Sequence, residues 1–319
     1  MIRASAPGKL MLAGEYTVSG PGGVALAVAI DRRLTVEVDS LGSDWRVSSE
    51  ALGLVDAEPE TVPIVARALE VVEGLPPGGR VVIRGDLGVG AKKPGFGGSA
   101  ALSAAVLVAL RRLSGAHSTS IGDVVELHRS VQGGRGSGYD VATVMTGGVT
   151  LFDNRNGRLL CRRVDWPSGL HAAVFFTGTG ASTVALLDRV ACWQAEDPED
   201  MRAYLGPLGE ETRELMDAWV AGDIGRILTA AAQVQEELDA FDRAGEIGIY
   251  AGGQMQLLAA VEDAGAIGRT SGAGGGDCLW ALSDRIDVIE RATRAAADLG
   301  FERLDVGFPA AELAVEEVG

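Results

Sequence analysis

The sequence predicts an α+β protein in which strands and helices are mixed. Strand-like runs of β-branched and apolar residues alternate with segments of helical spacing, without the regular βαβ order of a parallel sheet. Hydrophobic residues make up 47% of the 319 residues, so the chain can bury a substantial core as one large domain or two ordinary ones. Glycine is abundant at 45 residues, which favours many tight turns.

The first 131 residues predict short strands and amphipathic helices in turn. Apolar and β-branched runs predict strands at 10–12, 34–38 and 80–84. Apolar residues at helical spacing predict helices at 62–72, 99–113 and 121–131, and the first of these ends before Gly74 and Pro76.

The rest of the chain predicts strands, then mainly helix, then a last group of mixed elements. Strand patterns return at 147–175, and helical patterns dominate from there to Gly265. A strand is expected at 278–282, a helix at 287–299 and a final strand near 304–306. We expect a domain boundary between residues 155 and 170.

The charge and the cysteines exclude several classes of protein. A formal net charge of −16 argues against nucleic-acid binding, which needs clustered Lys and Arg, but a few local cations can still hold a phosphorylated substrate. The three cysteines are too scattered for a disulfide framework or a zinc site, so reduced thiols in the cytoplasm are expected. No secretory signal is evident, and no apolar run reaches the roughly 20 residues of a membrane span.

A glycine-rich segment at 94–101 opens directly into a predicted helix. Such a turn presents unpaired backbone N–H groups and the positive end of the helix dipole, which together suit a polyphosphate. The hydroxyl of Ser99, in the first turn, could reach Mg²⁺ or a phosphate oxygen. An ordinary glycine-rich loop with Ser99 as helix cap is the alternative. The segment is neither a Walker A motif nor a dinucleotide fingerprint.

Three further segments gain meaning from occurring together with this one. Residues 6–16 place Lys9 before an apolar strand, 136–142 place Asp140 after a glycine loop, and 271–278 hold four glycines in six residues. Taken singly, these would be a solvated lysine, a helix-capping aspartate and a structural hairpin. Jointly they predict a phosphate cradle with its cation and a carboxylate.

The segments 6–16, 94–101 and 271–278, with Asp140 between the last two, resemble the motifs of the GHMP kinases in the family's order. The resemblance covers residues 5 to 307. It implies two α+β domains, with an N-terminal domain at 1–165 like ribosomal protein S5 domain 2 and a ferredoxin-like C-terminal domain at 166–319. It places the active site between them.

Several details look like the phosphomevalonate kinase group of this family. Tyr16 stands where mevalonate kinases usually have His, and Asp277 stands where they usually have Gly. Further similarities to this group are the run around Asp140, His128 with Gln132, residues 177–183 and Lys93.

The resemblance assigns roles to individual residues. Lys9 would neutralise the approaching and transferring phosphates, and Asp140 would orient Lys9 or accept a proton. ATP would be held by Lys93, Pro94, Gly95, Phe96, Gly97, Gly98, Ser99 and Ala100. The substrate would be held by Glu15, Tyr16, Ser137, Gly138, Ser182, Arg269, Gly274, Gly275 and Asp277, with Lys92 and Arg135 as further phosphate-gripping candidates. Ser99 is the expected metal ligand.

The sequence departs from the family pattern around the metal. Gly98 replaces the first Ser of the usual Gly-Leu-Gly-Ser-Ser motif, which leaves Ser99 as its only hydroxyl. Arg129 and Ser130 occupy the region where mevalonate kinases carry a Glu ligand. Mg²⁺ is therefore expected to be held mainly by ATP oxygens and water.

The expected function is ATP-dependent phosphorylation of phosphomevalonate to diphosphomevalonate by a cytoplasmic monomer or homodimer without nucleic-acid or membrane partners. The first alternative is mevalonate kinase or another small-molecule GHMP kinase. A non-catalytic GHMP-fold binding protein and a diphosphomevalonate decarboxylase are less favoured. The presence of Lys9, Ser99 and Asp140 together argues against the non-catalytic form.

Overall fold

The computed structural model describes residues 1–319 except 21, 86, 88–93, 155–158 and 179–182. Within the described residues, the first sheet has the strand order β12-β1-β2-β5-β3-β4, with β6 on β2 and β7 on β6. All its pairs are antiparallel except β3 with β5. Its strands are β1 (Ile2–Ala13), β2 (Val24–Asp39), β3 (Trp45–Ser49), β4 (Leu54–Ala57), β5 (Gly79–Arg84), β6 (Val149–Asp153), β7 (Leu160–Val164) and β12 (Ala314–Glu317).

The pair of β1 and β2 is the longest in the sheet, and it is bent. The register shifts between Pro7 and Gly8 and again between Met11 and Ala13. Such irregularities bend a strand and re-aim its side chains. Lys9 lies between the two shifts, inside a strand that is longer than the expected 10–12.

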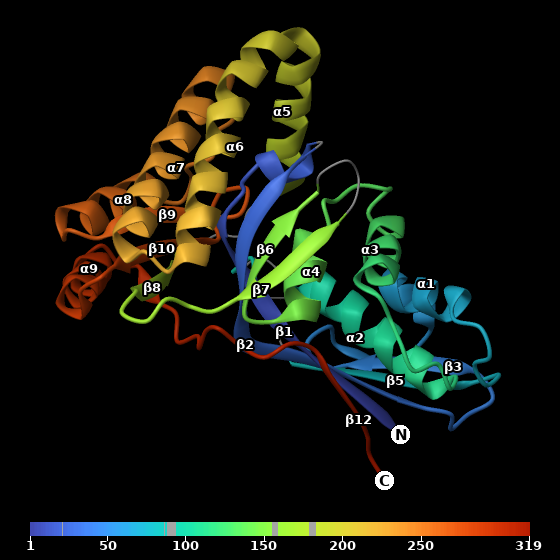
Figure 1. The fold of residues 1–319 in the computed structure, drawn as a ribbon. Helices are drawn as coiled ribbons and strands as arrows, with labels where there is room; N and C mark the ends of the chain where they lie inside the picture. Colours follow the sequence, from blue (N-terminus) through green and yellow to red (C-terminus); the bar gives the residue numbers. More distant parts are fainter. Residues whose placement is uncertain (21, 86, 88–93, 155–158, 179–182) are drawn as a thin grey trace.

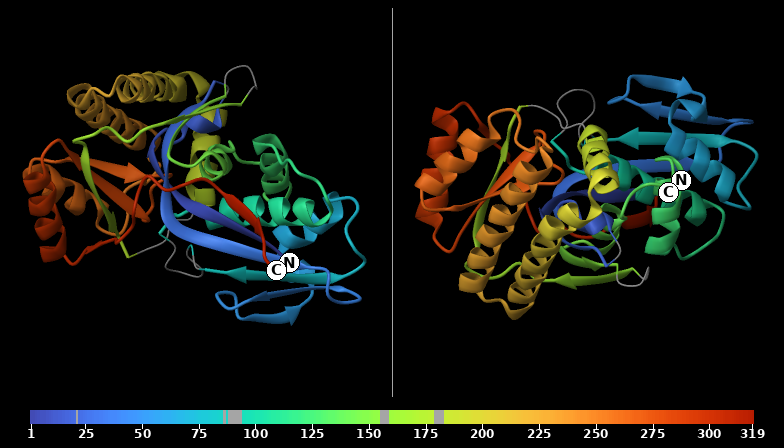
Figure 2. Two further views of the ribbon diagram at one scale, coloured as in Figure 1. Left: turned by 60° about the horizontal axis from the view of Figure 1, so that its bottom comes forward. Right: turned by 90° about the horizontal axis from the view of Figure 1, so that it is seen from above.

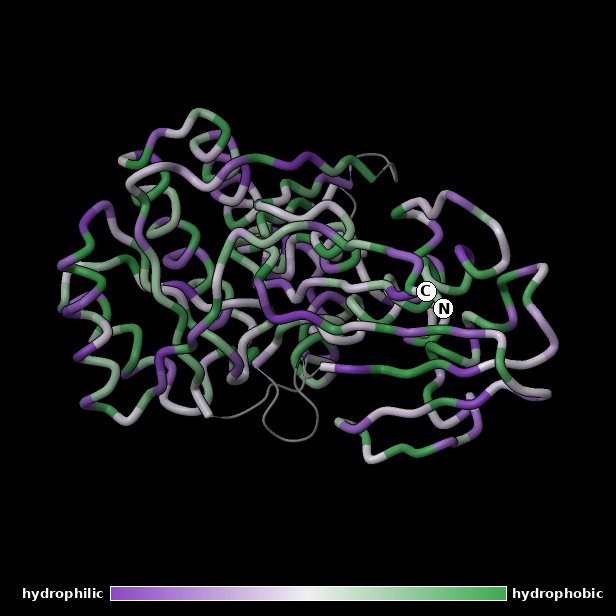
Figure 3. Tube along the Cα trace, turned by 90° about the horizontal axis from the view of Figure 1, so that it is seen from below, coloured by the Kyte–Doolittle hydropathy of each residue, from purple (hydrophilic) through white to green (hydrophobic). Residues whose placement is uncertain are grey.

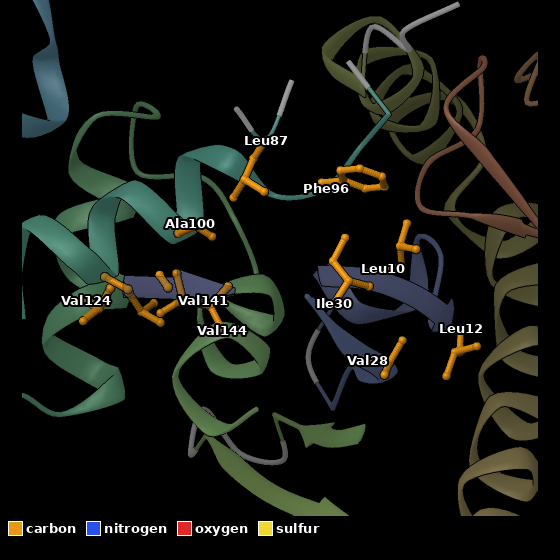
Figure 4. Close-up of a cluster of buried hydrophobic side chains, with 14 of the residues drawn as sticks. Leu10, Leu12, Val28, Ile30, Leu87, Phe96, Ala100, Val124, Val141 and Val144 are labelled. Atoms are coloured by element: carbon orange, nitrogen blue, oxygen red, sulfur yellow. The ribbon is translucent and has the colours of Figure 1, made fainter. Parts of the chain in front are cut away.

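Two helices of the first half, α2 and α4, pack on the first sheet, and the other two, α1 and α3, pack against α2 (Figure 1). The central one, α2, contacts both β1 and β2, and most of its buried residues are Ala, Leu and Val. Figure 4 shows Ala100 of α2 and Val141 in the same cluster as Val28 and Ile30 of β2. Small side chains let the helix lie close to the strands that carry the site. These helices are α1 (Pro63–Val71), α2 (Gly98–Leu113), α3 (Ile121–Ser130) and α4 (Tyr139–Thr146), with short 3₁₀ turns η1 (Thr17–Ser19) and η2 (Pro59–Thr61).

A second, antiparallel sheet has the order β11-β8-β10-β9 within the described residues. It consists of β8 (His171–Phe176), β9 (Ile267–Ser271), β10 (Cys278–Ser283) and β11 (Glu302–Arg303). Helices α8 (Gln254–Asp263) and α9 (Ile286–Asp298) share a separate hydrophobic cluster with β8 and β10. Hydrophobic and hydrophilic residues alternate along these outer helices, at the left of Figure 3, as expected of helices with one buried face.

Three long helices stand beside both sheets, at the top of Figure 1. They are α5 (Thr183–Glu196), α6 (Pro198–Ala221) and α7 (Ile224–Gly245). Because α6 contacts β2 of the first sheet and α7 contacts β9 of the second, this layer bridges the two sheets. The mainly helical character expected for this part of the chain is confirmed.

The strand expected near 304–306 is β11, two residues earlier at Glu302–Arg303, and it is not the final strand. The second sheet ends with β11, and Leu304 makes one further backbone hydrogen bond, to Val174. The chain then leaves toward the first sheet, where Gly307 and Asp31 are joined by two hydrogen bonds. It ends in β12, which pairs with β1 so that the two termini lie side by side (Figure 2).

The division at residue 165 stays a prediction. In chain order, the first sheet's strands run to β7 and the second sheet begins with β8, so this position lies between them. The return of β12 to the first sheet means that the tail lies with the N-terminal half. No helix of the described residues is long and apolar enough to cross a membrane.

Candidate active site

Lys9 lies where the glycine-rich segment 94–101 crosses β1. Its backbone N–H donates to the carbonyl oxygen of Phe96 at 2.9 Å. Its ammonium nitrogen donates to the carbonyl oxygen of Gly95 at 3.2 Å and to the phenol oxygen of Tyr139 at 3.0 Å. Strand β1, the loop 94–97 and the first turn of α4 therefore meet around one ammonium group.

Two glycines of this loop are required because other side chains approach its backbone. A Cβ atom on Gly97, whose φ is +75°, would lie 2.9 Å from Cε of Lys9. A Cβ atom on Gly95 would lie 2.7 Å from Oδ2 of Asp277. Besides leaving backbone amides accessible, these glycines make room for Lys9 and Asp277.

The loop leads into the N-terminus of α2, a helix of 16 residues. No side chain caps this end, so the N–H groups of Gly98, Ser99 and Ala100 keep their capacity to bind an anion. The helix dipole adds partial positive charge there. The local structure suits a phosphate, and the assignment of residues 94–100 to ATP stays a prediction.

Lys9 is buried, with 9% of its surface exposed, so its charge depends on neighbouring groups. Burial lowers the pKa of Lys9, but the electrostatic effects of Tyr139 and Asp140, a hydrogen bond with Tyr139 and the charge of Asp277 together outweigh it. The resulting pKa lies above the usual value. Lys9 is therefore a fixed cation at neutral pH.

Asp140 is brought to this place by α4. The helix begins after Gly138, whose φ of +91° suits glycine, and Asp140 lies in its first turn. The carboxylate is half-buried, and its Oδ1 accepts from the backbone N–H of Val141 at 2.9 Å. Lys9, Ser99 and Asp140, remote in sequence, are thus held by β1, α2 and α4, elements that contact one another.

Tyr139 is a site residue that the sequence analysis did not single out. Its phenol accepts the Lys9 hydrogen bond, and its ring centroid lies 5.2 Å from the Lys9 ammonium. Burial raises the pKa of Tyr139, so the phenol stays neutral and polar beside the cation. Its position directly before Asp140, after Gly138, is the only sequence signal that could have indicated it.

The glycine-rich loop 272–277 is held near β1 by hydrogen bonds from residues on both sides of the loop. The hydroxyl of Ser271 and the indole N–H of Trp280 both donate to the carbonyl oxygen of Met11, at 3.0 and 2.8 Å. The loop ends at Asp277, which has a positive φ of 58° and whose carbonyl oxygen accepts from the backbone N–H of Thr177 at 3.0 Å. This holds the Asp277 carboxylate beside Gly95 and Lys9.

Gly274 and Gly275, expected to bind substrate, contact the protein instead. A Cβ on Gly274 would lie 2.3 Å from the side chain of Ile249, and the N–H of Gly275 donates to the Ile249 carbonyl oxygen. They shape the loop that presents Asp277.

Glu15 and Arg269 form a buried ion pair, which does not support the expected contact of either with a substrate. Nη2 of Arg269 donates to both Glu15 oxygens, at 3.0 and 2.9 Å, and both side chains are 0% exposed. Nε of Arg269 also donates to the carbonyl oxygen of Leu12 at 3.2 Å. The pair joins the end of β1 to β9. In a sequence, charged residues beside glycine-rich segments look like residues that bind a ligand. Here both are completely buried and paired with each other, so they stabilise the fold.

Tyr16 is also turned inward. It is 6% exposed, and its hydroxyl donates to the carbonyl oxygen of Ala273 in the loop 272–277. Its φ of +59° is uncommon for a residue with a bulky side chain. Tyr16 therefore supports the loop 272–277 rather than offering its hydroxyl to a substrate.

The remaining predicted residues surround this centre. Phe96 and Ala100 are buried, and the carbonyl oxygen of Pro94 accepts from the thiol of Cys278 at 3.1 Å. Ser137 is half-buried, and its carbonyl oxygen accepts from Arg129 at 3.0 Å. Exposed Arg135 faces Asp188 of α5 at 3.6 Å. Lys92, Lys93 and Ser182 lie outside the described residues.

The described residues contain no group of three or more His, Cys, Asp or Glu side chains that could hold a metal ion. Ser99, at the open end of α2, offers a hydroxyl oxygen, which is a suitable donor for Mg²⁺. This donor set fits a cation that arrives with a polyphosphate better than one held by protein alone.

The chain resembles known proteins over nearly all its length. A family model described as GHMP kinases N terminal domain matches residues 63–148. The phosphomevalonate kinase of Streptomyces sp. (strain CL190) is 26% identical, over 88% of this chain and 89% of the relative. The mevalonate kinase of Thermococcus sibiricus is 30% identical, with the same two coverages of 88% and 89%.

The fold is shared with a crystal structure of Streptococcus pneumoniae phosphomevalonate kinase in complex with phosphomevalonate and AMPPNP. The TM-score is 0.81 at 23% identity, with 96% of this chain and 99% of the other covered. The expected α+β fold of the GHMP kinases is therefore confirmed.

Proposed function

Because the chain belongs to the GHMP kinase family, we propose that it transfers the γ-phosphoryl group of ATP to phosphomevalonate, forming diphosphomevalonate in the mevalonate route to isoprenoids. The observation that carries the proposal is the surroundings of Lys9. A buried ammonium group lies against the loop before α2, and the carboxylates of Asp140 and Asp277 are close enough to raise its pKa. Transfer between two phosphates needs a cation held in place to offset their negative charges.

The nucleotide would lie with its phosphates over residues 95–99. The backbone amides of the first turn of α2 would hold phosphate oxygens, and Ser99 would contact the cation. The Ser99 hydroxyl would help to hold Mg²⁺ when the cation arrives with ATP, and the cation would supply charge neutralisation there. The backbone and Ser99 then fix the terminal phosphate near Lys9.

Lys9 would neutralise the acceptor phosphate and the transferring group. Its ammonium has three donors, of which two are directed to Gly95 and Tyr139, so it is held in position before substrate arrives. Such preorganised charge stabilises the transition state without further rearrangement.

Asp140 would orient Lys9 and keep it charged. A phosphate acceptor is already largely ionised near neutral pH, since its second pKa is about 6. A general base is therefore less necessary than it would be for a hydroxyl acceptor. The charge effect of Asp140 on Lys9 supports this orienting role.

Mevalonate is the second candidate acceptor, because the Thermococcus sibiricus relative is a mevalonate kinase. Asp277 and Tyr16 favour phosphomevalonate, since both are typical of that group of the family. Asp277 lies beside Gly95, where it could touch the polar end of an acceptor or hold the loop. A cytoplasmic location and a monomeric or dimeric state stay predictions.

A coupled assay of ADP release tests the proposal. We expect release from ATP and Mg²⁺ with phosphomevalonate and little with mevalonate. Lys9→Met should lower the rate with phosphomevalonate by about 100-fold or more, as expected for the loss of a charge-stabilising donor. Exposed Arg67→Met, on α1, is the matched control and should keep the native rate. A preference for mevalonate, or no turnover with either acid, would contradict the proposal.

A further inference from the structure

His128, near the end of α3, contacts the one hydroxyl of the nucleotide loop. Its side chain is almost completely buried, with 3% of the residue exposed. Its ring nitrogen Nε2 lies 3.1 Å from Oγ of Ser99. The same nitrogen lies 3.0 Å from Nε2 of Gln132, one helical turn further along the chain.

The directions of these hydrogen bonds follow from the Gln132 amide, whose nitrogen faces the ring in this structure. An amide nitrogen only donates, so the ring nitrogen that faces it is the acceptor in the contact with Gln132. Ser99 must then donate its O–H to the same ring nitrogen. Two donors therefore converge on the lone pair of His128 Nε2.

This direction of the hydrogen bond decides what Ser99 can offer. A hydroxyl has one proton and two lone pairs. With the proton held by His128, the oxygen presents lone pairs toward the open end of α2, where Ser99 is exposed. Oxygen lone pairs suit a hard cation such as Mg²⁺, whereas an O–H pointing the same way would suit a phosphate oxygen.

We propose that His128, held by Gln132, is a positioning residue that turns the Ser99 hydroxyl so that its lone pairs bind the nucleotide's cation. This assignment rests on the proposed function. It makes Ser99 a ligand of the cation rather than a hydrogen-bond donor to a phosphate. It also identifies protein groups that compensate for the sparse metal ligands of this chain.

The position of His128 in α3 supports a shared role for this end of the helix. α3 packs against both α2 and α4. The next residue, Arg129, donates to the carbonyl oxygens of Gly136 and Ser137 at 2.7 and 3.0 Å, and so fixes the loop that leads to Asp140. One turn of α3 thus positions Ser99 and the approach to Asp140.

The test uses His128→Phe, which keeps the ring shape without the acceptor, and His128→Gln, whose amide oxygen restores it. With phosphomevalonate as acceptor, His128→Phe should raise the KM for Mg·ATP about tenfold and His128→Gln should recover most of that loss. His117→Phe, an exposed histidine before α3, is the matched control and should match the native enzyme.

A double-mutant cycle separates positioning from packing. If His128 acts through Ser99, His128→Phe should have no further effect on the KM for Mg·ATP in a Ser99→Ala background. Equal effects in both backgrounds would overturn the inference.

Two measurements need no turnover. In the ligand-free enzyme, the ¹⁵N chemical shift of His128 Nε2 should be that of an unprotonated nitrogen and should move in Ser99→Ala; a protonated Nε2 would overturn the inference. In the presence of Mg²⁺, His128→Phe should bind ATP more weakly than the native enzyme does. In excess EDTA, the two proteins should bind ATP equally well. If the native enzyme were inactive with every acid tested, the proposed function would be rejected. The ¹⁵N chemical shift would still decide the direction of the hydrogen bond between Ser99 and His128.

Discussion

Lys9 has a protein environment that is complete without substrate. Its buried ammonium is matched by a phenol, a backbone carbonyl and two nearby carboxylates. At the scale of single residues, activity should therefore respond to small changes around Lys9 that leave the lysine in place.

Tyr139→Phe keeps the ring and removes the oxygen that accepts from Lys9. We expect kcat to fall by about three- to tenfold, since a net hydrogen bond contributes about 0.5–1.5 kcal/mol. The Tm should also fall slightly, because the buried ammonium of Lys9 loses one of its hydrogen-bond partners. Steady-state kinetics with a thermal melt measures both, and an unchanged kcat would show that the phenol does not orient Lys9.

Asp140→Asn keeps the shape of the side chain and removes its charge. Because Asp140 raises the pKa of Lys9, we expect a large loss of kcat with little change in the KM for ATP. Asp153→Asn on β6 is the matched control, because it makes the same change from carboxylate to carboxamide outside the proposed site. Near-native turnover of Asp140→Asn would contradict both the orienting and the base role.

At the scale of elements, helix starts position most of the site. α2 begins uncapped at the proposed phosphate site, whereas α3 begins with a capping box of Ser120 and Asp123. The contrast fits their tasks, since a capped helix end has fewer free amides for a ligand.

The cap of α3 predicts a pH dependence of stability. A hydrogen bond from Arg111, with those from Ser120, lowers the pKa of Asp123 to about 2 against the opposing effect of burial. A depressed pKa gives stability that is complete above the unfolded value of about 3.9 and is lost as pH falls toward the folded value.

Asp123→Asn should therefore lower Tm at pH 6, and the difference from the native protein should shrink between pH 4.5 and pH 3. Melting curves across this range measure it. A difference that stays constant with pH would mean that the charge of Asp123 does not stabilise the helix.

At the scale of the whole molecule, the two sheets are joined through a fully buried ion pair. Arg269 of β9 binds Glu15 just after β1. Removing one partner leaves the other charge buried and unpaired, so Arg269→Met should cost about 3–5 kcal/mol of unfolding free energy. The double variant Glu15→Leu/Arg269→Met should recover much of this loss. Urea unfolding measures both, and a loss below 1 kcal/mol for the single variant would contradict the burial of the pair.

Much of this architecture could be predicted from local patterns. The helix at α2 follows from its run of Ala, Leu and Val, and the meeting of Lys9 with the helix start and Asp140 follows from the order of the glycine-rich segments. β12 could not be predicted because its four residues are all exposed and show no alternation. The contacts of Tyr139 with Lys9 and of His128 with Ser99 join distant positions, which local spacing does not encode.

The last strand of the chain also bears on how the protein is made. β1, which carries Lys9, has β2 on one edge and β12 on the other. During synthesis, one edge of the N-terminal part of β1 stays open until residues 314–317 leave the ribosome. A variant that lacks residues 314–317 would keep every proposed catalytic group and still expose a strand edge to neighbouring copies.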